Sequence, residues 1–147
     1  MLHLNGSRFA HGRSKFSDQS PEWLEPTAKI YVKVHFGPSA SVLLVQLDTG
    51  AAWSVLAPDV AEKAGISLRD GDPTKLQTRF GTLTGSLVRI PFTLIADDGE
   101  SLHTDGTFFV SADWPKKRSF LGYSGLLDSI RFALDPWKND FYFGPSP

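Results

Sequence analysis

The chain has 147 residues, of which 41% are hydrophobic and 21% are charged, and its formal net charge is -1. This size and composition fit one globular domain with a sizeable core and exclude a fibrous or wholly disordered chain. Basic residues accumulate only at Lys116–Arg118, so we expect no nucleic-acid partner. The absence of cysteine excludes disulfides, thiolate nucleophiles and thiolate zinc sites. Because neither a signal peptide nor an apolar run of about 18 residues is seen, we expect a cytoplasmic protein with no membrane partner.

In the first 27 residues the apolar positions follow neither the helical nor the strand period, and Pro21 and Pro26 interrupt the segment. We therefore expect a flexible N-terminal extension over 1–27 and a single domain over 28–147. The alternation of apolar and polar residues in "AKIYVKVHF" predicts a half-buried strand. A turn is expected at Gly37–Ala40, and the apolar run Val42–Leu47 is typical of a strand buried on both faces.

Further along the chain, Pro58 and Gly65 bound a segment that predicts a short helix. The segments 75–80 and 86–95 predict two strands, and we expect "GTLTG" between them to be the tip of a hairpin. Later segments predict strands at 101–110 and 120–122, a short helix at 124–130, and a terminal hairpin made by "RFALD" and "DFYFG". Many short strands with one or two short helices favour an all-β barrel or sandwich.

Several kinds of catalytic site lack support in this sequence. The four histidines are scattered and none forms an i, i+4 pair, so we expect no metal site. Neither a nucleotide-binding glycine motif nor the G-x-S-x-G elbow of serine hydrolases occurs. We therefore expect no cofactor.

Asp48 is the residue that the ordinary patterns do not explain. It stands directly after an apolar strand and begins the triplet Asp48-Thr49-Gly50. Ionised carboxylates are rarely buried without a partner, so Asp48 is either a turn residue or a functional acid. The triplet alone is weak, because tripeptides of this kind also occur by chance.

The order of the elements around Asp48 resembles the retropepsin-like aspartic protease family. The resemblance rests on an apolar strand ending in Asp-Thr-Gly-Ala, a glycine-containing hairpin, and "FLG" before a short helix. It implies a closed or partly open acid-protease β-barrel with one or two short helices. It also implies a homodimeric aspartic endopeptidase, a hydrolase acting on peptide or protein substrates, because the chain has one such triplet and the mechanism needs two carboxylates.

The resemblance also implies a role for each matching residue. The catalytic loop would be Asp48, Thr49 and Gly50. Substrate would contact the residues after this loop and a flap formed by the hairpin, namely Ala51, Ala52, Trp53, Val55, Gly81, Thr82, Leu83 and Gly85. Structural support beneath the loop would come from Phe120, Leu121 and Gly122.

The match is incomplete, and alternatives stay open. Ala52 and Tyr123 stand where retroviral relatives carry an Asp and an Arg that pair, so substrate anchoring is expected to differ. A non-catalytic dimeric peptide-binding or assembly module on the same fold is the main alternative, and an unrelated small β-barrel binder is another. Trp53 suits a pocket wall or a core position equally. The strand "DFYF" suits either a dimer interface or an ordinary edge strand with core aromatics.

Overall fold

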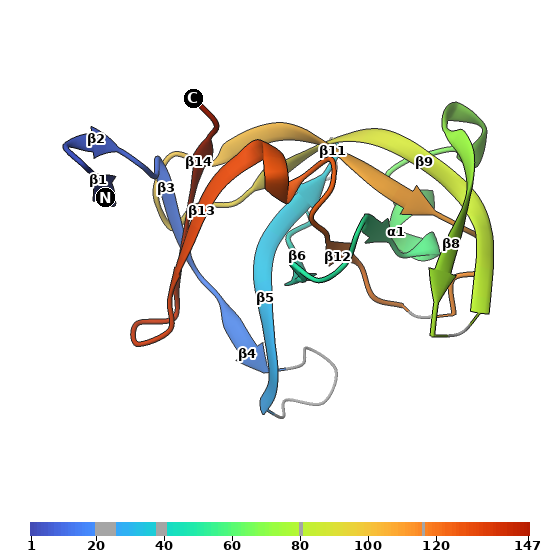
Figure 1. Ribbon diagram of the computed structural model, residues 1–147, viewed down its shortest axis with the longest axis horizontal. Coiled ribbons are helices and arrows are strands. Elements are labelled where there is room, and N and C mark those ends of the chain that lie inside the picture. The colour runs from blue at the N-terminus through green and yellow to red at the C-terminus, as the bar shows by residue number, and fades with distance from the viewer. Residues whose placement is uncertain (20–25, 38–40, 80, 116) are drawn as a thin grey trace.

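The computed structural model describes residues 1–19, 26–37, 41–79, 81–115 and 117–147 (Figure 1). These residues form mostly strands, and within them the single α-helix is α1 (Pro58–Lys63). Two 3-10 turns, Leu68–Asp70 and Leu127–Ser129, complete the helical structure. The all-β prediction is confirmed. The turn expected at Gly37–Ala40 falls mostly on residues 38–40, which lie outside the described ranges.

Six strands pair in a ring and close a barrel. Neighbours around the ring follow the order β5, β6, β12, β7, β11, β9, and β9 pairs with β5 through Val34↔Leu94 and Phe36↔Phe92. Two further strands, β4 and β8, extend the same sheet. The bounds of the eight strands are β4 (Ser17–Gln19), β5 (Pro26–Phe36), β6 (Leu43–Leu47), β7 (Ser54–Leu56), β8 (Asp72–Thr78), β9 (Gly81–Leu94), β11 (Leu102–Val110) and β12 (Phe120–Leu121).

The barrel core is built from the apolar positions of these strands. Val32 and Val34 are fully buried, as the alternation in β5 predicts, and Phe36, Phe92 and Phe108 pack with ring centroids 5.4 to 6.0 Å apart. The run Val42–Leu47 departs from its prediction. Only its last three residues are buried, whereas Leu44 points away from the interior and is 43% exposed.

A second sheet joins the two ends of the chain, at the end of the molecule opposite the β8–β9 hairpin (Figure 1). Its strand order is β10 (Asp98–Gly99), β3 (Gly12–Lys15), β14 (Asp140–Pro145) and β13 (Ile130–Asp135). A small hairpin of β1 (His3–Leu4) and β2 (Ser7–Arg8) precedes it. The expectation of a flexible extension is therefore wrong for residues 3–19, because β3 pairs with β14 and Phe16 packs in the core.

An ion pair fastens this N-terminal strand to the C-terminal hairpin. The Asp140 side chain is only 1% exposed, and its two oxygens face Lys15 Nζ at 2.6 Å and the Arg13 guanidinium at 3.5 Å. The hydrogen bond from Lys15, reinforced by the nearby positive charges, lowers the pKa of Asp140 even though burial opposes this shift. Because ionised carboxylates are seldom buried without partners, loss of β3 would strand this charge.

Three local predictions need correction. The β8–β9 hairpin exists, but Gly81 already pairs with Thr78, so "GTLTG" begins β9 instead of forming the tip. The helix predicted at 124–130 is reduced to one 3-10 turn, because Gly125 has a φ of +74° and Leu126 is not helical. The strand "DFYF" is not an edge strand, since β14 is paired on both sides, and its two phenylalanines are fully buried.

In the part of the chain that the structure describes, no helix has the length and apolar character needed to cross a bilayer.

Candidate active site

Asp48 sits where β6 leaves the barrel. Its backbone N–H donates to the Leu121 carbonyl at 2.9 Å, which continues the parallel β6–β12 ladder by one residue. Its side-chain Oδ1 accepts the N–H of Gly50 at 3.0 Å, and its carbonyl accepts the N–H of Ala51 at 3.2 Å. These bonds hold the triplet in a tight turn and fix the orientation of the carboxylate.

The second loop of the site is formed by "FLG" and the residues that follow it. Gly122 donates to Ser54 Oγ at 2.8 Å, and the N–H groups of Tyr123 and Ser124 donate to the carbonyls of Ala51 and Ala52 at 2.9 and 2.8 Å. A Cβ on Gly122 would lie 2.4 Å from the carbonyl atoms of Trp53, so only glycine lets the two loops approach this closely. The predicted supporting role of this segment therefore has a clear physical basis.

A cleft of about 580 Å³ opens around Asp48. It brings together residues from β5, β6, β7, the hairpin and the loop before β12. The lining residues are Lys29, Gln46, Asp48, Gly50, Ala51, Ala52, Trp53, Val55, Leu76, Gln77, Thr78, Arg79, Trp114, Arg118 and Phe120. Asp48 is the only carboxylate among these lining residues.

The sequence-based site residues divide into two groups in the structure. Those on the β6–β7 segment all lie together: Asp48, Gly50, Ala51, Ala52, Trp53 and Val55 line the cleft, and Thr49 is exposed on the same turn. Gly81, Thr82, Leu83 and Gly85 lie on β9 and do not line the cleft. The hairpin instead reaches it through Leu76 to Arg79 of β8 and the turn.

Leu76 to Arg79 carry no glycine and no catalytic motif, so the sequence offered little signal for them. Trp114 and Arg118, in the loop between β11 and β12, were missed for the same reason. The Trp114 ring packs edge-on against Phe120 with centroids 5.8 Å apart, and its indole N–H donates to the Arg118 carbonyl at 3.1 Å. These contacts hold Trp114 in place beside Arg118 and Phe120 at the cleft wall.

The positions of the missing ion pair are adjacent in space. The backbone bonds that join Ala51 and Ala52 to Tyr123 and Ser124 place the two loops side by side, but no charged side chain occupies either position. Tyr123 is 52% exposed next to the Asp48 turn. Because both members of the pair found in retroviral relatives are absent together, neither position leaves a buried charge without its partner.

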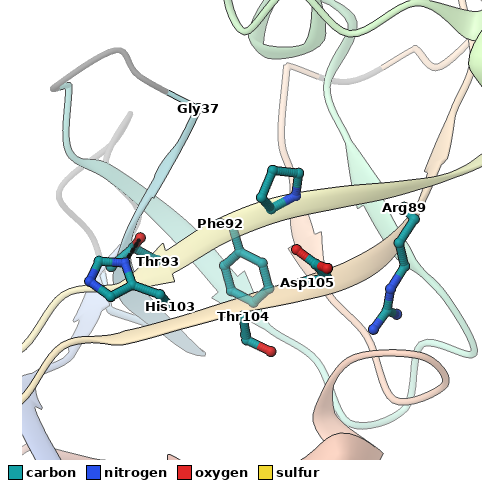
Figure 2. Close-up of a pocket in the computed structure, with 8 residues that line it drawn as sticks. Gly37, Arg89, Phe92, Thr93, His103, Thr104 and Asp105 are labelled. Carbon is teal, nitrogen blue, oxygen red and sulfur yellow. Dashed lines mark hydrogen bonds between the residues drawn. The ribbon is translucent and has the colours of Figure 1, made fainter.

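A second, more open groove of about 700 Å³ lies on β9 and β11 (Figure 2). Figure 2 shows His103 beside Thr93, whose Oγ1 lies 2.8 Å from His103 Nδ1, and Arg89 next to Asp105. Arg89 donates to Thr107 Oγ1 and to the Gly125 carbonyl. Thr93, His103 and Arg89 are engaged with their own neighbours and do not converge on a common point, so the Asp48 cleft is the stronger candidate site.

The chain resembles known proteins in both sequence and fold. A family model described as "Aspartyl protease" matches residues 32–113, more than half of the chain. A retropepsin-like aspartic protease from Rickettsia conorii aligns with a TM-score of 0.53 and 17% identity over 90% of this chain and 89% of that one. The retroviral protease-like domain of Ddi1 from Leishmania major aligns with a TM-score of 0.51 and 16% identity over 82% of this chain and 94% of that one.

No curated protein matches the sequence significantly. At these identities the structural alignments show a retropepsin-like fold, in agreement with the closed barrel described above. Together with the family match, they establish that this chain belongs to the aspartyl protease family.

Proposed function

We propose that the protein is a homodimeric aspartic endopeptidase in which Asp48 of each chain supplies one carboxylate of the catalytic pair. The observation that carries this proposal is the placement of Asp48. It is half-buried on a turn held by two backbone–backbone hydrogen bonds and by the bond from the Gly50 N–H to its own carboxylate, at the wall of a cleft large enough for a peptide segment. Rigid support of this kind is what a catalytic carboxylate requires.

The reaction needs a second carboxylate. Two carboxylates about 3 Å apart share one proton, so that the ionised one activates a water molecule while the protonated one donates to the scissile carbonyl oxygen. Since Asp48 is the only carboxylate among the described cleft residues of one chain, the second acid comes from another copy. The two copies of Asp48 then face each other across a two-fold axis.

The surface around Asp48 is compatible with such a partner. Thr49, Gly50 and Ala52 are exposed on the turn, and Tyr123 is exposed beside it. The same turn can therefore meet its copy without moving core residues. Phe141 and Phe143 are buried, so these two β14 aromatics are not offered to a partner, and the contact that we propose lies around the Asp48 turns.

The experiment is peptide cleavage by the wild-type protein and by Asp48→Asn. A proteome-derived peptide library, with mass-spectrometric detection of new termini, avoids assuming a specificity. We expect cleavage by the wild type and its loss in Asp48→Asn, with the same molar mass by light scattering. Asp105→Asn makes the same chemical change outside the cleft and serves as the matched control.

Two results would contradict the proposal. Cleavage that survives Asp48→Asn would exclude Asp48 as the catalytic acid. Saturable peptide binding with no turnover by the wild type across acidic and neutral pH would favour the non-catalytic peptide-binding module.

A further inference from the structure

The charge of the Asp48 cleft is opposite to that of the whole chain. The chain has a formal net charge of -1, yet the cleft is lined by three cations, Lys29, Arg79 and Arg118, against the single carboxylate of Asp48. The three cations come from different elements, namely β5, the β8–β9 turn and the loop before β12. Their convergence on one cleft is therefore a product of the fold and not of a basic run in the sequence.

The apolar part of the same cleft is aromatic. Trp53, Trp114 and Phe120 line it together with Val55 and Leu76. Trp114 and Phe120 stack edge to face, which makes this wall stiff. Apolar side chains of a bound peptide would lose water against these rings, while the cations stand at other positions of the same cleft.

From these two observations, the cations and the aromatic wall, we propose that the cleft selects peptide segments in which acidic side chains flank apolar ones. The apolar residues would pack on the aromatic wall, and the carboxylates would face Lys29, Arg79 and Arg118. Cations around a cleft with apolar walls attract anionic ligands and repel cationic ones. This inference rests on the proposed function for the chemistry at Asp48, but the selectivity itself is a property of binding.

The test uses three fluorescently labelled octapeptides with the same central Phe-Leu pair. They differ only at the two flanking positions, which are both Glu, both Gln or both Lys. Binding is measured by fluorescence anisotropy on the full-length Asp48→Asn protein, so that no peptide is consumed. Because partly solvated ion pairs contribute modestly, we expect the Glu peptide to bind roughly two- to fivefold more tightly per charge than the Gln peptide at low salt.

The Lys peptide should bind more weakly than the Gln peptide, and raising the salt concentration should reduce both differences. Arg79→Glu should weaken the preference, because it replaces one of the three cations that line the cleft with an anion. Arg79 is exposed, so its replacement leaves the core intact. Lys75→Glu makes the same charge change on the same hairpin, outside the cleft lining, and should leave the preference unchanged.

Equal affinity for the three peptides, or equal effects of Arg79→Glu and Lys75→Glu, would overturn the inference. So would displacement of the Glu peptide by a single-stranded oligonucleotide at equal concentration, since that result would indicate unspecific attraction of polyanions. Failure of the wild type to cleave any peptide, with the binding order intact, would instead contradict the proposed function and leave the selectivity standing.

Discussion

Gly122 is the position at which the two active-site loops touch, and Gly122→Ala tests that contact. An added Cβ would lie 2.4 Å from the carbonyl carbon and oxygen of Trp53 and 2.7 Å from the Ser54 nitrogen. Ordinary contact begins at 3.4 Å, so the backbones would have to separate by about 1 Å (3.4 - 2.4). Overpacking of this kind costs about 1–3 kcal/mol. Loss of the buried bond from Gly122 to Ser54 Oγ adds about 1–2 kcal/mol.

We therefore expect Gly122→Ala to lower the free energy of unfolding by about 2–5 kcal/mol, measured by urea denaturation. Gly65→Ala is the matched control. Unlike Gly122, Gly65 has a positive φ, +72°, which favours glycine, but no atom lies within 4 Å of its added Cβ. Gly65→Ala should lower the free energy of unfolding by only about 1–2 kcal/mol. Equal stability of the two variants would refute the steric argument, as would an unchanged stability of Gly122→Ala.

Three further predictions concern the terminal sheet and the surface. Because the folded pKa of Asp140 is lowered, its contribution to stability is fully present above the ordinary aspartate pKa of about 3.9 and is lost progressively as pH falls below that value and through the lowered folded pKa. Urea denaturation between about pH 6 and pH 3 should show the onset of this loss, and a smaller one in Asp140→Asn. Removal of residues 1–16 should lower the free energy of unfolding strongly in the same assay, because β14 loses its partner β3 and Asp140 loses Lys15 and Arg13. Unchanged stability would show that this N-terminal segment is dispensable. Trp137 is 94% exposed in the β13–β14 turn, so Trp137→Ser should change the free energy of unfolding by less than about 0.5 kcal/mol, whereas a larger change would indicate packing absent from this fold.

Local patterns predicted the elements whose formation depends on near neighbours. The alternation of β5, the helix that begins at Pro58 and the terminal hairpin all follow from periodicity or from proline and glycine positions. The loop that carries Asp48 was found because a carboxylate after an apolar strand needs an explanation. These features require no knowledge of which distant residues meet.

The failures have non-local causes. β3 carries small and polar residues, and its strand partner β14 lies more than 120 residues away in the sequence, so no local period marks it. The sequence predicts Gly85 in the hairpin tip, but a Cβ there would lie 2.4 Å from the Val110 carbonyl oxygen. The glycine serves close packing between β9 and β11, and the hairpin turn falls earlier. Arg79 and Arg118 reach the cleft only through the three-dimensional arrangement of the barrel.

The shared active site is the central claim, and a mixing experiment tests it most directly. Wild-type protein and Asp48→Asn are combined at fixed total concentration, unfolded together and refolded so that chains redistribute, and peptide cleavage is measured against the wild-type fraction. If each site needs Asp48 from both chains, activity follows the square of that fraction, and an equal mixture keeps about one quarter of the wild-type rate. A linear decline, with about one half remaining, would show that one chain is sufficient and would contradict the account.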